Sequence, residues 1–145
     1  MRIKCIANKH KDLEKYEYKA LADDIFGRFN ISKQHEYSLT VGEEYSILGM
    51  ILFQEYLAYL TDSNGLILTA PCYLFEVTDT KKIPKNWYFR IVEKDENIYP
   101  FIQAIWGYEE LCLDKQAYEK LIVEMEEESQ RTYFRRKIEL SKLNY

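Results

Sequence analysis

Hydrophobic and polar residues alternate along much of residues 41–106, and this pattern predicts β-strands. Across residues 45–53 the odd-numbered positions are apolar apart from Gly49, and the even-numbered positions 48–52 are apolar too. A strand that is apolar on both sides is typical of the centre of a sheet. We therefore expect residues 45–53 to form one central strand, with a sharp bend at Gly49.

Further strands are expected around short polar turns. The dipeptide Asn64-Gly65 suits the positive φ angles of a tight hairpin, so residues 54–62 and 66–70 are predicted to be its two strands. The same alternation predicts strands over residues 2–7, 73–79, 87–93 and 98–106. Pro100 favours an edge position for the last of these strands, because proline cannot donate a ladder hydrogen bond.

Two segments have helical signals. Asp12 could cap a helix in which Leu13, Tyr16 and Ala20 share a face and Gly27 ends it, although the aromatic residues there suit an extended segment equally well. The second signal is stronger. Asp114 is a good N-cap for a long amphipathic helix over residues 114–143, whose first half should pack on the sheet while its second half projects. Its apolar stripe consists of Tyr118, Leu121, Ile122 and Met125.

Together these elements predict an α+β fold. We expect a strongly bent antiparallel sheet or a small SH3-like barrel with a long C-terminal helix. The chain of 145 residues fits one domain over residues 1–145, with a β-rich core over residues 41–106. Its apolar runs are shorter than the roughly 18–20 residues that cross a bilayer, and its start turns polar after six residues. A cytoplasmic protein without membrane contact is the expectation.

Charge is unevenly distributed along the chain. The net charge is −4, but residues 41–113 carry eleven acidic and five basic side chains, a balance of −6. This acidic middle block argues against nucleic-acid binding, which requires clusters of Lys and Arg. It suits a basic protein partner through electrostatic steering, and an ordinary solvated acidic surface is the competing interpretation.

Catalytic and metal-binding patterns are weak in this sequence. The cysteines Cys5, Cys72 and Cys112 are widely spaced, and a Cys72 nucleophile would need a base that neither histidine clearly supplies. Cys72 therefore reads as a buried cysteine at the start of a strand. Adjacent acids such as Glu43-Glu44 read as solvated surface, and no metal-ligand spacing or phosphate-binding glycine loop occurs. We expect no cofactor, no metal site and no catalytic site.

Aromatic residues are the most informative surplus. The chain contains 13 Tyr, 7 Phe and 2 Trp, and 13 tyrosines exceed what a small core accommodates easily, because each buried hydroxyl needs a partner. Tyrosine and tryptophan on a sheet surface are typical of protein-binding patches. The predicted partner-binding residues are Tyr56, Tyr59, Asp62, Asp79, Trp87 and Tyr88.

Four segments in order resemble a known group of proteins. They are "VGEEYSILGM" (41–50), "APCYLFEVTD" (70–79), "IPKNW" (83–87) and "GYEEL" (107–111). Over about residues 41–121 the chain resembles small, mostly uncharacterised bacterial proteins that are often regarded as immunity proteins. The resemblance implies a protein that binds and neutralises a partner toxin, and it assigns no role to any single residue.

The sequence thus leads to one main hypothesis and two alternatives. The main hypothesis is a non-enzymatic protein-binding module, of the immunity type, that occludes a basic toxin. The first alternative is a small-molecule-binding or enzymatic domain with a pocket inside the bent sheet, lined by Tyr45, Tyr59, Phe75 and Trp87. The second is a structural subunit that assembles through the C-terminal helix. The oligomeric state is left open.

Overall fold

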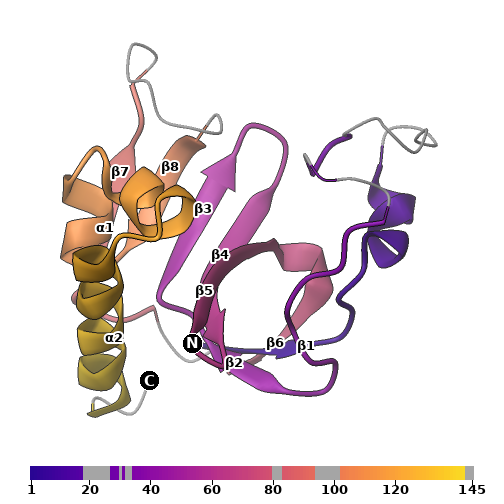
Figure 1. Ribbon diagram of the computed structural model, residues 1–145, viewed down its shortest axis with the longest axis horizontal. Helices are drawn as coiled ribbons and strands as arrows, with labels where there is room; N and C mark the ends of the chain where they lie inside the picture. Colours follow the sequence, from indigo (N-terminus) through magenta and orange to yellow (C-terminus); the bar gives the residue numbers. More distant parts are fainter. Residues whose placement is uncertain (18–26, 30, 32–33, 80–82, 94–101, 143–145) are drawn as a thin grey trace.

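The structure is α+β, as predicted. This computed structural model describes residues 1–17, 27–29, 31, 34–79, 83–93 and 102–142. Among these residues, two antiparallel sheets carry the strands, and helical segments follow the last strand (Figure 1). The sheets are not closed into a barrel, so the SH3-like alternative is wrong. None of the helices in the described part of the chain is both long and apolar enough to cross a membrane.

The smaller sheet has three strands in the order β2-β1-β6. Its strands are β1 (Arg2–Cys5), β2 (Glu44–Ser46) and β6 (Phe75–Asp79). The larger sheet has five strands in the order β5-β4-β3-β8-β7. Its strands are β3 (Gly49–Phe53), β4 (Leu57–Ser63), β5 (Leu66–Pro71), β7 (Tyr88–Ile91) and β8 (Ile102–Gly107).

The hairpin between β4 and β5 is confirmed. Asn64 and Gly65 both have positive φ angles, 51° and 84°, as a two-residue type I′ turn requires. The predicted edge position of the last strand is wrong, because β8 lies between β3 and β7. β8 begins at Ile102 and so contains no proline, while Pro100 itself lies outside the described residues.

The apolar run over residues 45–53 is two strands and not one. The chain leaves β2 at Ser46 and enters β3 at Gly49, so it crosses from the smaller sheet to the larger one through Ile47 and Leu48. Ile47 is buried in one hydrophobic core and Leu48 in the other. Both sides of the run are apolar because it contributes to two cores, and β3 is the central strand of its sheet, as expected.

The two cores divide the molecule. The N-terminal core, which includes Ile3, Leu13, Ile47 and Phe75, lies between the smaller sheet and the β4–β5 side of the larger sheet. The C-terminal core lies between the larger sheet and the helices. Its buried members include Leu48, Ile51, Leu60, Ile105, Leu111, Leu121, Tyr133 and Leu140. Tyr56 packs against both cores.

The C-terminal helix predicted over residues 114–143 is broken, and its second half, which was predicted to project, packs on the C-terminal core through Tyr133 and Leu140. After α1 (Glu109–Leu113), the π-helix η3 (Glu119–Val123) ends near Met125, whose φ of 53° is left-handed, and α2 (Glu127–Lys142) begins as a new helix. Acidic residues at 126–128 favour a helix start, because carboxylates interact well with the positive end of a helix dipole. Asp114 accepts a bond from the Gln116 amide at 2.9 Å, as a capping residue does.

The N-terminal helical signal corresponds to a short 3₁₀ helix. This helix, η1, spans His10–Tyr16 and buries Leu13, but it begins before Asp12, so Asp12 is not its cap. Ala20 lies outside the described residues. A second 3₁₀ turn, η2 (Cys72–Leu74), replaces the first residues of the strand that was predicted from residue 73.

Candidate functional site: the exposed edge strand β7

β7 is one edge of the larger sheet. Its register pairs Phe89 with Trp106 and Ile91 with Ala104, and the Val92 amide donates to the Gln103 carbonyl at 2.9 Å. Hydrogen-bonded and non-hydrogen-bonded pairs alternate in an antiparallel ladder. The backbone groups of Phe89 and Ile91 therefore face away from β8, toward the side where the described residues place no further strand.

The same two residues present apolar side chains to solvent. Phe89 is 52% exposed and Ile91 is 63% exposed. Phe89 stacks on Trp106 of β8 with a centroid distance of 4.7 Å, which fixes the orientation of its ring. Tyr88, which points to the other face of the sheet, is also exposed. We call Tyr88, Phe89 and Ile91 the β7 edge.

On the face of the sheet opposite to the Phe89 and Ile91 side chains, α1 contacts β7. The Cys112 thiol donates to the Tyr88 carbonyl at 3.4 Å, and burial raises the pKa of Cys112 to about 11, so this thiol stays protonated. Beside it, Leu111 of α1 packs against Gly49 and Gly107, where an added Cβ would lie 2.7 Å from the Leu111 side chain. α1 thus supports the strand from one side.

The structure does not bring the six predicted partner-binding residues together. Trp87 and Tyr88 lie at the start of β7, with Trp87 half-buried against the N-terminal core. Tyr59 is buried in that core, and Tyr56 is half-buried between the two cores, where burial raises its pKa. The remaining two residues, Asp62 and Asp79, are carboxylates on other strands.

Asp62 makes internal contacts with α2. Its Oδ1 accepts bonds from the Tyr133 hydroxyl at 2.9 Å and from Lys137 Nζ at 2.8 Å, and its side chain is 7% exposed. Asp79 lies at the end of β6, opposite Arg2 of β1, and is half-buried. Asp62 therefore contributes to the attachment of α2 to the larger sheet.

Part of the acidic middle block is neutralised within the molecule. Glu110 of α1 accepts bonds from Arg135 at 2.7 Å and from Arg136 at 2.9 Å, and these arginines lower the pKa of Glu110 against an opposing effect of burial. Lys137 neutralises the Asp62 carboxylate in the same way. The −6 balance of residues 41–113 is thus offset in part by basic side chains of α2.

Three of the four residues proposed to line an internal pocket are packed core side chains. Tyr45, Tyr59 and Phe75 are buried, and their rings contact one another at centroid distances of 5.8 Å for Tyr59–Phe75 and 6.5 Å for Tyr45–Phe75. Trp87 packs against the same core. These rings fill the space between the sheets at this point.

A buried polar pair near the N-terminus was missed by sequence reasoning. His10 Nε2 lies 3.0 Å from Glu17 Oε1, and both side chains are almost fully buried. Glu17 also accepts a bond from the Arg28 amide at 2.9 Å. The pair connects η1 to residue 28 inside the fold. A seven-residue spacing would place two residues on one face of a continuous helix, but η1 ends at Tyr16 and Glu17 is extended, so the sequence did not indicate this contact.

Cys72 lacks the features of an activated nucleophile. It is half-buried in η2, and burial raises its pKa above the ordinary thiol value despite an opposing effect of Arg28. Within the described residues, no three histidine, cysteine or carboxylate side chains lie close enough to hold a metal ion. The β7 edge is therefore the feature on which a functional proposal can be based.

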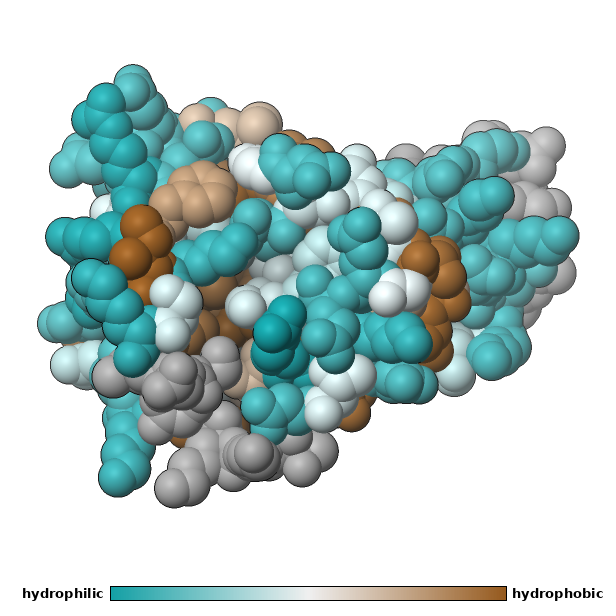
Figure 2. All heavy atoms as spheres, turned by 90° about the horizontal axis from the view of Figure 1, so that it is seen from below, coloured by the Kyte–Doolittle hydropathy of each residue, from teal (hydrophilic) through white to brown (hydrophobic). Residues whose placement is uncertain are grey.

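The face drawn in Figure 2 is mostly hydrophilic, and its apolar atoms occur in separate patches, one of them at the end of the molecule where α2 lies. Comparison of the chain with protein-family models, with curated proteins and with solved structures finds no match.

Proposed function

We propose that this protein is a non-enzymatic protein-binding module and that the β7 edge is its binding surface. The observation that carries the proposal is the coincidence, in Phe89 and Ile91, of outward-facing backbone groups with exposed apolar side chains. An exposed strand edge can accept an extended segment of another protein as an additional strand. Backbone hydrogen bonds then supply affinity, and alternate side chains supply specificity.

The partner we propose is a basic protein. The chain carries a net charge of −4, and Glu93 is exposed directly after β7, at the start of a stretch over residues 93–96 that holds three acids and one lysine. Negative charge beside the docking strand would steer a positively charged segment toward it and would make the association sensitive to salt. Binding would occlude the part of the partner that pairs with β7.

We further propose that this binding serves an immunity-type role. In that role the partner is a toxin, and its neutralisation requires only occlusion of the toxin surface. The basis of this step is the resemblance of four sequence segments, so it remains a prediction. It is tested separately, by asking whether the protein relieves the toxicity of the partner that it binds.

The binding proposal is tested with the products of the genes that flank this one. Each product is co-expressed with the protein, and association is measured by co-purification and by titration calorimetry at low and high salt. We expect one basic product to bind, and Ile91→Lys to weaken binding by about tenfold or more, because it places a charge in the docking strand.

The matched control is Val123→Lys. Val123 is also an exposed apolar residue, at 51% compared with 63% for Ile91, but it lies in η3. We expect Val123→Lys to bind like the wild type. The proposal fails if no flanking product binds, or if Ile91→Lys binds as tightly as the wild type and the control.

A further inference from the structure

One face of α2 is directed mostly away from the core and carries an acid at its start and a base at its end. Successive residues of an α-helix are rotated by about 100°, so the face opposite the buried residues Tyr133 and Leu140 can be identified by position. We call it the outer face of α2. It consists of Glu127, Arg131, Phe134, Arg135, Ile138 and Lys142, of which Phe134 is half-buried and packs in part against the C-terminal core.

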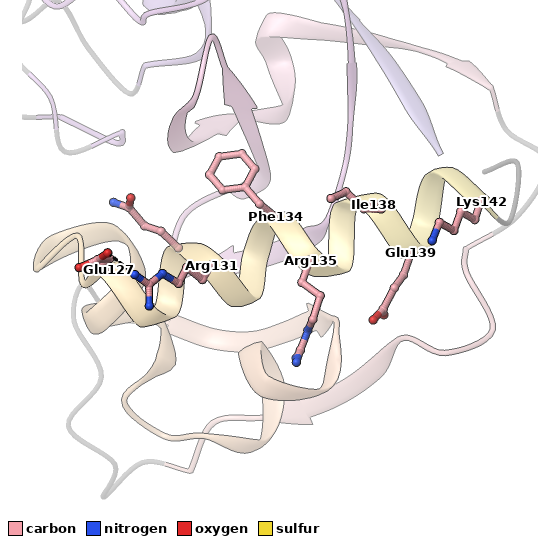
Figure 3. Close-up of a pocket in the computed structure, with 8 residues that line it drawn as sticks. Glu127, Arg131, Phe134, Arg135, Ile138, Glu139 and Lys142 are labelled. Atoms are coloured by element: carbon pink, nitrogen blue, oxygen red, sulfur yellow. Dashed lines mark hydrogen bonds and ion pairs between the residues drawn. The ribbon is translucent and has the colours of Figure 1, made fainter.

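The outer face borders an open hollow of about 630 Å³. Figure 3 shows Glu127 and Arg131 side by side at one end of the helix and Lys142 at the other, with Phe134 and Ile138 between them. Ile138 is 57% exposed, which is a large exposure for an isoleucine on a helix that is otherwise anchored to the core. The face therefore combines an apolar centre with charged ends.

The charges on α2 are complementary to those of a second copy of α2 that runs antiparallel to it. Glu127 near the start has an opposite charge to Lys142 near the end, and Arg131 has an opposite charge to Glu139 at the side of the face. A parallel copy would place each of these charges beside its own like charge. Only the antiparallel arrangement sets negative against positive at both ends.

We propose that α2 is the contact surface of a symmetric dimer, in which it packs antiparallel against α2 of a second copy. The twofold axis passes beside Phe134 and Arg135. Glu127 then pairs with Lys142 of the second copy, and Arg131 with Glu139 of the second copy. Because the interface is isologous, each of these pairs occurs twice. The inference is independent of the β7 edge, which belongs to a different element.

The centre of the interface is compatible with this symmetry. Ile138 lies opposite the aliphatic part of Arg131 of the second copy, so its exposed surface is covered, and Phe134 lies next to the axis. Arg135 meets its own counterpart, but each Arg135 is already bound to Glu110 of its own chain at 2.7 Å. This ion pair reduces the repulsion between the two arginines.

The interface is small, so we expect weak association. One helix against one helix falls at the low end of the size range for specific complexes. We therefore expect a dissociation constant on the order of 100 µM, between the micromolar and millimolar ends of the affinity scale. Glu127 already pairs with Arg131 of its own chain, so each intermolecular pair extends an existing ion pair. All of these pairs are solvent-exposed, and the association should therefore weaken as salt is added.

Sedimentation equilibrium between about 10 µM and 1 mM, a range chosen to bracket that affinity, tests the proposal directly. We expect the wild-type protein to pass from monomer to dimer across this range. Glu127→Lys and Lys142→Glu should each weaken self-association by about tenfold, because each places like charges opposite one another twice. Both positions are exposed, so each change should cost only the small helix-dipole and ion-pair contribution of its side chain and should leave the fold intact.

A mixture of the two variants provides the control for misfolding and for nonspecific effects. In a mixed dimer, the lysine introduced at position 127 of one chain would face the glutamate introduced at position 142 of the other. The second contact would join the native Lys142 of the first chain to the native Glu127 of the second, so both contacts are attractive. We expect the equimolar mixture to recover wild-type association.

Three results would each overturn the antiparallel pairing. The first is a wild-type protein that remains a monomer at the highest concentration. The second is a pair of single variants that associate like the wild type. The third is a mixture of the variants that does not recover the association of the wild type.

Discussion

Asp62 and Tyr133 form a contact between β4 and α2 that is buried on both sides. The Tyr133 side chain is fully buried, and the Asp62 side chain is 7% exposed. We expect Asp62→Ala to lower the free energy of unfolding by about 1–3 kcal/mol, because it leaves a buried hydroxyl without an acceptor. Urea unfolding measures the change.

The interpretation of this contact is checked in a second background. The Tyr133→Phe variant has no hydroxyl at this position that could lose its acceptor. Asp62→Ala should therefore lower the free energy of unfolding less in this variant than in the wild type. Strictly additive effects of the two changes would show that the two groups do not act together.

The three cysteines should differ sharply in reactivity. Cys5 and Cys112 are buried, whereas Cys72 is half-buried. In the folded protein we expect Cys72 alone to react readily with an alkylating reagent, at a rate that still increases above pH 8.5, about the usual thiol pKa, because burial raises the pKa of Cys72. Mass spectrometry of the alkylated protein identifies the site. A rate that levels off near neutral pH would instead indicate an activated thiolate.

At the scale of elements, the close approach of α1 to the larger sheet depends on two glycines. A Cβ at Gly49 would lie 2.7 Å from Leu111 Cδ2 and 2.9 Å from the Trp106 carbonyl oxygen. We expect Gly49→Ala to destabilise the protein by about 1–3 kcal/mol through overpacking. In a Leu111→Ala background, which removes one of the two clashes, the same change should cost less. An equal cost in both backgrounds would mean that Leu111 is not the obstacle.

The positions of strands could be predicted from the sequence where one side of a strand faces water or where a turn requires particular residues. The Asn64-Gly65 hairpin and the strands beside it follow from local patterns. The crossing at Ile47 and Leu48 does not, because a run that is apolar on both sides looks the same whether it serves one core or two. The break near Met125 was missed although the sequence carried a signal for it, because residues 126–132 are all polar and the apolar stripe resumes only at Tyr133.

The predicted site residues also show that local sequence patterns do not reveal contacts between distant parts of the chain. Alternation indicated that Tyr56 and Tyr59 lie in or beside a strand, but it could not indicate that a second sheet covers them. Asp62 was missed as an internal contact because its partners are 71 and 75 residues away along the chain. Tyr88 lies at the exposed edge, although Phe89 and Ile91, which face outward there, were not selected.

At the scale of the whole molecule, buried tyrosines should limit stability at alkaline pH. Burial raises the pKa of Tyr37, Tyr56, Tyr108 and Tyr133 well above the usual value near 10. Above about pH 10 the unfolded chain loses these protons first, so it binds fewer protons than the folded chain, and stability falls as pH rises. Each such tyrosine contributes a slope of about 1.4 kcal/mol per pH unit.

Urea unfolding as a function of pH measures this effect. We expect a steep loss of stability above about pH 10, and a smaller slope in Tyr133→Phe, because one of the four groups no longer titrates. A free energy of unfolding that stays constant between about pH 9 and 11 would contradict the burial of these hydroxyls.

The central claim is that β7 accepts a strand from a protein partner, and amide hydrogen exchange tests it most directly. In the free protein, the Phe89 and Ile91 amides face away from β8 and should exchange faster than those of Tyr88 and Arg90, which pair with β8. On addition of the partner, NMR-detected exchange at Phe89 and Ile91 should slow markedly. A bound partner that leaves the exchange of these two amides unchanged would contradict the account.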